Sequence, residues 1–410
     1  MPLFALIRHP RPAPAPAAAA TTTTAPSAAP TVLVVWCGHR PGPWAVRSLR
    51  TAGHRVIAAH PHGDPGGRST AVLSPRRYPP AVADPAGFLA WIRETCLLEG
   101  VDVVLPLDED VVRLLAENPL GLTRTVVAGP DARQFRMLCD KLELANTAAL
   151  AGADHPASVE VGVDGPAGPW PALPSIVKPR TSLSDAAAAP VVSVRSVEER
   201  DAAIAHLRLS DLDAVVQEQI IGRPWVLHCV RDAAGTVGMV AARVETTYPR
   251  VVGTSSVSTV VPIPPDLERH AARLLDVAGY VGPCCMNLLE RDGRYWFHDI
   301  NLRLAASVGA SVSAGFDLPR LGVEAALGRM TLPVGARMRS ITYVPLASER
   351  AALRDAMAGR TGEVPRDLAL RIARAAVARD HQLDPPLHDP QWAYDRVTAL
   401  ARRALRALPL

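Results

Sequence analysis

Short apolar segments that alternate with helical segments constrain the first third of the chain most strongly. Residues 32–36, 54–60 and 101–107 are short apolar runs, which predicts buried strands. Between them lie two segments with helical character, one ending near Gly53 and one over residues 88–100. Strands that alternate with helices predict a parallel, doubly wound sheet, so we expect a Rossmann-like domain over residues 31–130.

The loop after the first strand lacks the Gly-x-Gly-x-x-Gly pattern with which dinucleotide-binding domains hold a pyrophosphate. This absence counts against a dinucleotide-dependent enzyme, which stays an alternative for residues 31–130. That alternative predicts that NAD, and not ATP, raises the melting temperature.

Length and composition indicate a soluble globular protein of two or three domains. The chain has 410 residues, of which 48% are hydrophobic and 20% charged. No apolar run reaches the roughly 20 residues that span a bilayer. The net charge of +4 is not gathered in basic blocks, so we expect neither membrane nor nucleic acid as a partner. Six scattered cysteines without a Cys-x-x-Cys predict reduced thiols and a cytoplasmic protein.

The two ends of the chain differ in composition from its middle. Residues 1–30 are rich in Ala, Pro and Thr, and Arg8, His9 and Pro10 interrupt their apolar run. We therefore expect a disordered tail and not a signal peptide. Residues 331–410 are rich in Arg and Ala and have helical periodicity, which predicts a mostly helical carboxy-terminal extension.

Only two of the 44 basic residues are lysines, Lys141 and Lys178. An ammonium is a compact point charge and a guanidinium is a planar fork, so a lysine in an arginine-rich chain indicates a position that arginine does not fill. Lys178 ends an apolar strand and precedes a hydroxyl-rich loop with Ser182 and Ser184, a combination that can hold phosphate oxygens. An ordinary surface turn, and for Lys141 a solvated helix lysine, are the alternatives.

Polar side chains are grouped on two strands near residue 290. Residues 291–294 predict a hairpin turn, which brings Asn287 close to Asp299 and Asn301. Alternate positions on a strand share a face, so Asp299, Asn301 and Arg303 lie side by side. One carboxylate and two amides suit Mg²⁺, and the guanidinium suits a phosphate or a carboxylate. A structural ion pair at a strand end is the alternative.

A third polar segment, Gln217–Gly222, follows an apolar strand and contains the apolar pair Ile220–Ile221. Its backbone can bind the edge of an adenine. The alternative is simply a strand followed by a turn.

In this order the segments resemble the ATP-grasp superfamily. The matching pieces are Asp140-Lys141, Lys178-Pro179-Arg180, Gln217–Gly222 and Asp299–Arg303. Both lysines of the chain fall on lysine positions of the family pattern. The resemblance implies an α/β and α+β fold with a Rossmann-like pre-ATP-grasp domain (31–130), a two-subdomain ATP-grasp domain (131–330, lid about 150–222) and a helical carboxy-terminal extension (331–410).

The resemblance also implies an ADP-forming carboxylate–amine ligase that acts on small amino-acid-like substrates, in specialised metabolism, through an acyl phosphate. The implied cofactors are ATP and Mg²⁺, for which Mn²⁺ can substitute. The implied partners are small carboxylates and amines, and the implied assembly is a homodimer. The implied roles are nucleotide binding by Lys141, Lys178, Ser182, Ser184, Gln217, Glu218 and Ile220, metal binding by Asn287, Asp299 and Asn301, and catalysis by Lys178 and Arg303.

Four residues between the adenine segment and the metal hairpin are candidates for the substrate pocket: Arg243, Arg250, Ser255 and Ser256. Arg243 suits a substrate carboxylate, and an exposed strand arginine is the alternative.

Two departures from the family pattern leave a further alternative open. Asp299 stands where the family usually has Glu, and Asn287 where it has Glu or Gln. A protein that kept the fold for regulation or as a scaffold, and lost turnover, would bind ATP without hydrolysing it.

Overall fold

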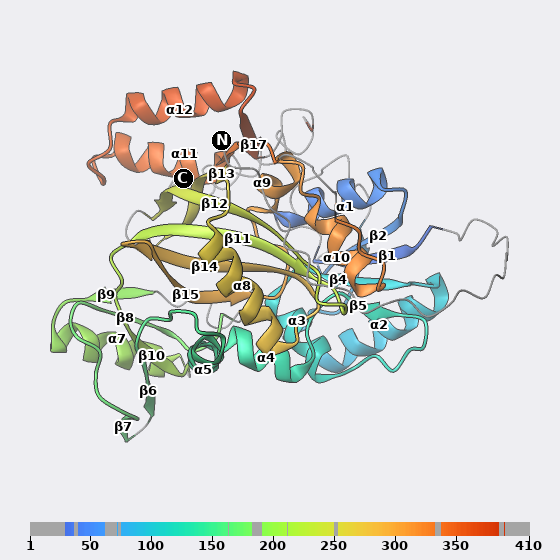
Figure 1. Cartoon of the computed structure of the whole chain (residues 1–410), viewed down its shortest axis with the longest axis horizontal. Helices are drawn as coiled ribbons and strands as arrows, with labels where there is room; N and C mark the ends of the chain where they lie inside the picture. Colours follow the sequence, from blue (N-terminus) through green and yellow to red (C-terminus); the bar gives the residue numbers. More distant parts are fainter. Residues whose placement is uncertain are drawn as a thin grey trace, which may run out of the picture.

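The computed structural model describes residues 29–36, 40–61, 72, 75–162, 164–182, 191–210, 212–249, 253–332, 338–384 and 389. Predictions for the tail before residue 29, for Ser184 and for Arg250 concern residues outside these ranges. The described residues form three β-sheets with helices packed on and between them (Figure 1).

The first sheet is parallel and has the strand order β3-β2-β1-β4-β5, which confirms the predicted doubly wound domain. Its apolar strands are buried on both faces, as in parallel sheets covered by helices. The elements are β1 (Thr31–Val35), α1 (Pro41–Thr51), β2 (Arg55–His60), β3 (Arg76–Arg77), α2 (Pro85–Glu99), β4 (Val103–Pro106), α3 (Glu109–Glu117) and β5 (Val126–Val127).

Two helices lead from this sheet to the rest of the chain, α4 (Ala132–Cys139) and α5 (Lys141–Ala151). Asp131 and Gln134 form a capping box at the start of α4. Asp140 separates the helices, and its side chain accepts hydrogen bonds from the first backbone N–H groups of α5. Lys141 is therefore held at the first position of a helix.

The second sheet lies in the segment predicted to be the lid, and we keep that name for it. Its strand order is β7-β6-β10-β8-β9. Its described pairs are antiparallel, and α7 packs against β8. Ser196 caps α7 by accepting from the backbone N–H of Glu199. The elements are β6 (Ser158–Gly162), β7 (Gly165–Pro166), β8 (Ser175–Pro179), β9 (Val192–Val194), α7 (Val197–Leu209) and β10 (Ala214–Glu218).

The third sheet has seven strands, in the order β15-β14-β11-β12-β13-β16-β17, and crosses the middle of the molecule (Figure 1). Asp292 and Gly293, both at positive φ, form the predicted turn between β14 and β15. The strands are β11 (Arg223–Arg231), β12 (Val237–Tyr248), β13 (Thr254–Val261), β14 (Gly282–Arg291), β15 (Arg294–Asn301), β16 (Thr342–Pro345) and β17 (His381–Asp384). The helices are α8 (Pro265–Ala278), α9 (Val308–Ser313), α10 (Leu318–Ala326), α11 (Leu346–Met357) and α12 (Pro365–Val377).

The carboxy-terminal extension is joined to the third sheet. Helices α11 and α12 agree with the prediction, but β16 and β17 were not predicted. Strands of four residues have little local signal, and these two form because β13 offers its edge to β16. Glu349 of α11 is fully buried and accepts from Ser256 of β13 and from Arg371 of α12. The extension is thus an integral part of the sheet and its cover.

A single apolar cluster joins the first sheet to the third. Val32 and Val34 of β1 share this cluster with Leu304, Val308 and Tyr343. The carboxyl end of β1 therefore lies against the segment that follows β15. None of the helices among the described residues has the length and hydropathy that crossing a bilayer requires.

Candidate functional site

The three side chains predicted to bind a metal lie together on the β14–β15 hairpin. Asn287 of β14 is paired with Asp299 of β15, and Asn301 is two residues further along the same strand. Both amides donate a hydrogen bond of 2.9 Å to Oδ2 of Asp299. The hairpin thus presents one carboxylate and two amides on one face, as the alternation of strand residues predicts.

Lys141 reaches this carboxylate from α5. Its Nζ lies 3.8 Å from Oδ1 of Asp299 and donates to Oγ of Ser182 at 2.9 Å. Ser182 in turn donates to Oδ1 of Asp299 at 3.4 Å. Three segments that are remote in sequence, the start of α5, the end of β8 and the hairpin, therefore meet at Asp299.

Lys178 approaches from the lid and is buried. Its Nζ donates to Oε1 of Gln217 at 2.8 Å and to the backbone oxygen of His298 at 3.2 Å. Burial lowers the pKa of Lys178 to about 7, and the charge of Lys141 adds to the effect while Asp299 opposes it. Within the part of the chain that the structure describes, no carboxylate forms an ion pair with Lys178. A phosphate anion would therefore stabilise its charged form.

The charges of this cluster favour an anion. Burial opposes the ionisation of Asp299, but Lys141, His298 and Lys178 outweigh it and lower the pKa of this carboxyl to about 2. One ionised carboxylate thus stands among two lysines and the guanidinium of Arg303. A triphosphate would complete the charge balance.

Arg303 connects the cluster to the first sheet. Its Nη2 lies 3.2 Å from Oε2 of Glu109 and 3.1 Å from Oδ1 of Asn301. Glu109 is 5% exposed and is the first residue of α3, directly after β4. Burial raises the pKa of Glu109 to about 7, against the effect of Arg303. A glutamate of the amino-terminal domain thus contacts the arginine at one end of the cluster.

Sequence reasoning missed Glu109 as a site residue. The available signal was the acidic run Asp108-Glu109-Asp110 directly after a predicted strand. Ligands of open α/β sheets bind outside the carboxyl ends of the strands. Polar residues at the carboxyl end of β4 are therefore candidates for a ligand-binding site on the sequence alone.

The predicted adenine segment lies where the chain passes from the lid to the third sheet. The backbone N–H of Glu218 donates to Ala157 at 2.7 Å, so it is occupied within the lid. Ile220 is 5% exposed. Gln217 accepts from Lys178 and donates to Ser158 at 2.8 Å, so its side chain positions the lysine. Adenine contacts at this segment therefore stay a prediction for the backbone after Glu218.

The structure does not bring the three described substrate candidates, Arg243, Ser255 and Ser256, into this cluster. Arg243 pairs with Trp225 across β11 and β12, and Trp225 pairs with Leu288, the neighbour of Asn287. Successive strand residues face opposite ways, so Arg243 lies on the other sheet face, where it contacts Glu245 at 3.3 Å. Ser256 is 1% exposed and bound to Glu349, and the Oγ of Ser255 is buried.

The side chains at Asp299 fit a hard divalent cation. Within the described ranges, no group of three or more His, Cys, Asp or Glu side chains is placed to hold a metal. The hairpin instead combines one ionised carboxylate with two amides. A half-turn of each amide group exchanges the positions of its oxygen and its nitrogen. Carboxylate and amide oxygens are ligands of Mg²⁺, which commonly retains waters and takes phosphate oxygens as well. Asn287, Asp299 and Asn301 would hold such an ion together with nucleotide phosphates.

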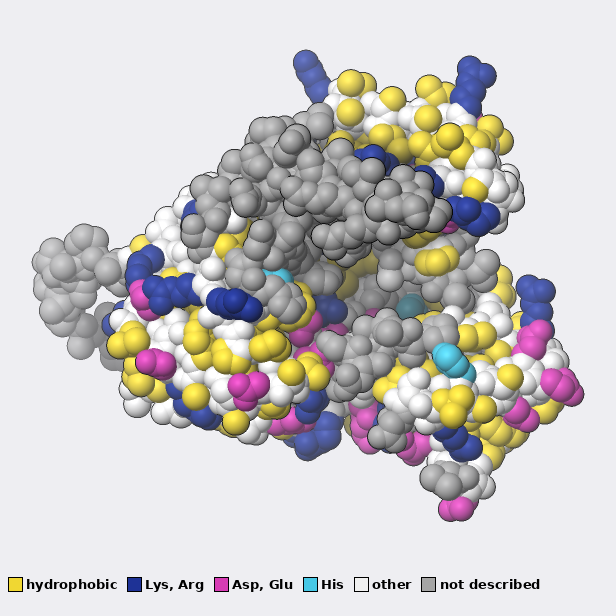
Figure 2. All heavy atoms as spheres, turned by 180° about the vertical axis from the view of Figure 1, so that it is seen from behind, with side chains coloured by type: hydrophobic (Ala, Val, Ile, Leu, Met, Phe, Trp, Pro, Cys, Tyr) yellow, Lys and Arg dark blue, Asp and Glu magenta, His cyan; other side chains and the backbone are white. Residues whose placement is uncertain are grey.

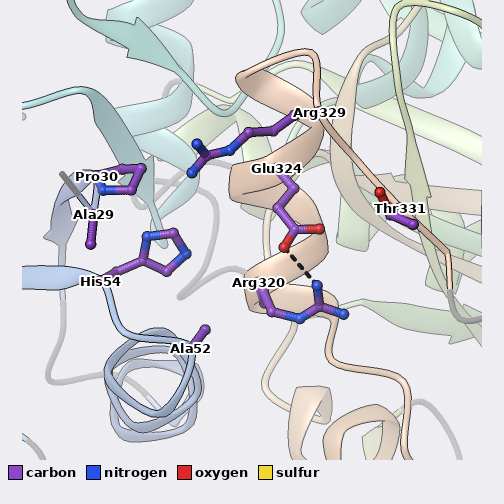
Figure 3. A pocket seen from close by; sticks show the side chains of 8 residues that line it. All are labelled: Ala29, Pro30, Ala52, His54, Arg320, Glu324, Arg329 and Thr331. Atoms are coloured by element: carbon purple, nitrogen blue, oxygen red, sulfur yellow. Dashed lines mark hydrogen bonds and ion pairs between the residues drawn. The ribbon is translucent and has the colours of Figure 1, made fainter. Parts of the chain in front are cut away.

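The face opposite to that of Figure 1 is hollowed between the first sheet and the lid, and charged side chains are visible in the hollow (Figure 2). A separate pocket of about 450 Å³ lies near the amino end of β1 and beside α10 (Figure 3). Its lining is Ala29, Pro30, Ala52, His54, Arg320, Glu324, Arg329 and Thr331, and an Arg320–Glu324 ion pair of 2.6 Å crosses one side. Because it lies at the amino end of the strand, this pocket is distinct from the Asp299 cluster.

Solved structures share this fold. An L-amino acid ligase from Bacillus licheniformis superimposes with a TM-score of 0.58 at 16% identity, over 73% of this chain and 75% of that one. A biotin carboxylase from Campylobacter jejuni gives 0.58 at 14% identity, over 75% and 73%. An N5-carboxyaminoimidazole ribonucleotide synthetase from Thermus thermophilus gives 0.56 at 18%, over 76% and 82%. These proteins are ATP-grasp ligases.

The chain has the ATP-grasp fold. No protein-family model matches it, and no curated protein matches its sequence. In this ATP-grasp structure the first sheet is the pre-ATP-grasp domain, and the lid and the third sheet enclose the cluster at Asp299. The predicted fold class is confirmed.

Proposed function

We propose that this protein is an ADP-forming ligase that joins a small amino-acid-like carboxylate to an amine. The observation that carries the proposal is the convergence of Lys141, Lys178 and Arg303 around Asp299, with Asn287 and Asn301 beside it. The L-amino acid ligase among the structural matches supports amino acids as the substrate class.

The reaction has two steps. A carboxylate oxygen attacks the γ-phosphorus of ATP, the bond from this phosphorus to the β,γ-bridging oxygen breaks, and ADP leaves. The neutral amine then attacks the acyl carbon, the carbon–oxygen bond to the phosphoryl group breaks, and inorganic phosphate leaves. The amine nitrogen loses one proton as the amide forms. Phosphoryl transfer of this kind depends on positioning and on charge stabilisation by the protein.

Each cationic residue has a place in this scheme. Lys141 and Lys178 approach from α5 and from the lid, so both can bind phosphate oxygens of one nucleotide. Arg303 is held between Asn301 and Glu109, at the boundary with the pre-ATP-grasp domain, where its fork can bind the phosphoryl group or the substrate carboxylate. A bound Mg²⁺ would neutralise charge on the phosphates.

Magnesium binding should depend on the nucleotide. Asp299 lies beside Lys141 and Lys178, and these cationic side chains repel a free divalent cation, so the site is weak without a nucleotide. We therefore expect MgCl₂ alone to leave the melting temperature unchanged, whereas MgATP raises it by several degrees. Differential scanning fluorimetry measures both. A rise with MgCl₂ alone would contradict the predicted charge balance, and NAD serves as the control ligand.

The proposed reaction is tested by phosphate release from purified protein with ATP, Mg²⁺ and pairs of L-amino acids. We expect release that requires a particular amino acid and a dipeptide product detectable by mass spectrometry. Lys178→Ala is the inactive control, and Arg269→Ala, a change in an exposed ion pair on α8, is the matched active control.

A regulatory or scaffold protein that binds ATP without turnover is the second candidate. It is favoured by the single carboxylate in the metal site, since Asn287 stands where the family pattern has Glu or Gln. This candidate predicts a rise in melting temperature with MgATP and no phosphate release with any amino acid pair. Formation of a dipeptide would exclude it.

A further inference from the structure

Trp36 has an unusual backbone conformation at the end of β1. Its φ is +68°, and among the described residues only Asp292, in a hairpin turn, shares a positive φ without being glycine. A bulky side chain is rare in this left-handed region, because its Cβ crowds the backbone. Such outliers persist where the surrounding structure enforces them, and they gather at ligand sites.

The strand order places Trp36 at a ligand-binding position of the sheet. In the order β3-β2-β1-β4-β5 the chain leaves β1 toward β2 and leaves β4 toward β5, so the crevice opens between β1 and β4. Val35 pairs with Pro106, and the N–H of Leu107 donates to the oxygen of Val35. Trp36 thus stands beside Leu107, two residues before Glu109, at the mouth of this crevice.

Trp36 packs against the apolar clusters on both faces of the first sheet. One cluster holds Val32 and Val34 and includes Leu304, which directly follows Arg303, and the other holds Leu33 and Val35. The indole thus covers the carboxyl end of β1. It is only half-buried, so part of it is accessible.

Other contacts hold the surroundings of this indole in place. The ring of His60 at the end of β2 lies against it in a tilted arrangement, with a ring-centroid distance of 5.3 Å and an interplanar angle of 47°. Arg40, just before α1, donates to Asp384 of β17 at 3.4 Å, and the indole N–H of Trp44 donates to the same carboxylate at 3.2 Å. The chain after Trp36 is thus tied to the carboxy-terminal extension.

We propose that Trp36, supported by His60, forms the wall of the substrate crevice and recognises an aromatic side chain of an amino-acid substrate. The inference rests on the proposed ligase function and adds a substrate class to it. The accessible ring of Trp36 offers a flat apolar surface, and aromatic rings gain offset or edge-to-face contacts on such a surface in addition to the area they bury. Glu109 and Arg303 at the other end of the crevice provide the polar groups that a zwitterionic backbone needs.

The test compares wild type with Trp36→Ala and Trp36→Phe. We expect wild type to release phosphate with phenylalanine or tyrosine at lower KM than with alanine or glycine. In Trp36→Ala the KM for the aromatic amino acid should rise about tenfold or more, since one stacked pair and its buried area are lost. The KM for ATP should stay unchanged. Trp36→Phe should have a KM for the aromatic amino acid close to that of wild type.

A matched control separates recognition from packing. Trp91→Ala removes a half-buried indole of α2 that stacks with Tyr78 and Phe88 in the same domain, and it should leave the KM for the aromatic amino acid unchanged. Equal KM values in wild type and Trp36→Ala would overturn the inference. Equal KM values of wild type for alanine and phenylalanine would overturn it too, although the ligase proposal would survive that result.

A direct binding measurement covers the case in which the ligase proposal itself fails. If no amino acid elicits phosphate release, isothermal titration of phenylalanine into the MgATP-bound protein decides. Binding in wild type that Trp36→Ala weakens about tenfold or more upholds the role of the indole in a binding protein. Absence of binding to wild type, or equal binding to both proteins, overturns it.

Discussion

Asp299→Asn is expected to reduce ADP formation by about 10³-fold or more. The substitution keeps the shape of the side chain and one acceptor oxygen, which can still accept from Asn287 and Asn301 as Oδ2 does, but it removes the negative charge of Asp299. Loss of one preorganised electrostatic group in an active site costs about 10²–10³ in rate, and here the same group is also the charged ligand of the predicted cation. Phosphate release under saturating MgATP measures the effect.

The same substitution should destabilise the protein. The pKa of Asp299 is lowered from 3.8 to about 2, so its ionised form stabilises the fold above pH 3.8, and this contribution is lost as the pH falls toward 2. The shift corresponds to about 2 kcal/mol at neutral pH. Denaturant unfolding at pH 7 should show that loss. Asp276→Asn, which removes an exposed carboxylate paired with Arg231, is the control and should change neither stability nor activity.

Turnover by Asp299→Asn at a wild-type rate would contradict the assignment of the metal site. A variant that fails to bind MgATP, yet still unfolds in a single cooperative transition, would support it. The two measurements together separate a lost site from a lost fold.

Lys178→Ala is expected to reduce phosphate release by about 10²–10³-fold without lowering stability. The side chain supplies a buried positive charge from the lid, and no other lysine of the chain can replace it, because Lys141 is already bound to Ser182 near Asp299. We expect the KM for ATP to rise as well, since this charge binds the nucleotide before the transition state. Steady-state kinetics with varied ATP distinguishes the two effects.

The stability of Lys178→Ala provides the internal check. The pKa of this lysine falls from 10.5 to about 7 on folding, so the unfolded chain binds more protons between these values. Stability in wild type therefore declines as the pH falls from about 10.5 to 7, by about 4 kcal/mol at most. Removing the lysine removes that pH dependence. It also removes the hydrogen bonds that Nζ donates to Oε1 of Gln217 and to the backbone oxygen of His298. Wild-type kinetics in Lys178→Ala, or an unchanged pH dependence, would refute the role assigned to Lys178.

Asp299→Asn and Lys178→Ala thus share a loss of activity but differ in the sign of their effect on stability. A carboxylate stabilised by its neighbours is lost in one case, and a lysine destabilised by burial is lost in the other. A general unfolding of the domain would lower stability in both.

The local parts of the site could be predicted from the sequence. A turn over residues 291–294 and the alternation of strand residues suffice to place Asn287 beside Asp299 and Asn301, because both rules act over a few residues. The doubly wound first sheet followed equally from the alternation of apolar strands and helices.

The contacts that join remote segments could not be predicted in this way. Glu109 meets Arg303 across 194 residues of sequence, and Ser256 meets Glu349 across 93. The sequence position of Ser256 predicts a place in the substrate pocket. In the structure Ser256 instead binds Glu349 and so joins the extension to β13. The short strands β16 and β17 likewise depend on an edge that another part of the chain provides.

The sequence by itself therefore determined the elements, the hairpin and the pair of lysines, because periodicity, turn chemistry and residue type are local properties. The tertiary structure alone decided which charges face one another at Asp299, that Glu109 reaches Arg303, and that Trp36 stands beside Leu107 at the carboxyl end of β1. Those outcomes depend on how the first sheet, the lid and the third sheet pack. Contacts between apolar side chains determine this packing, and the apolar residues of the sequence do not show which polar groups it brings together.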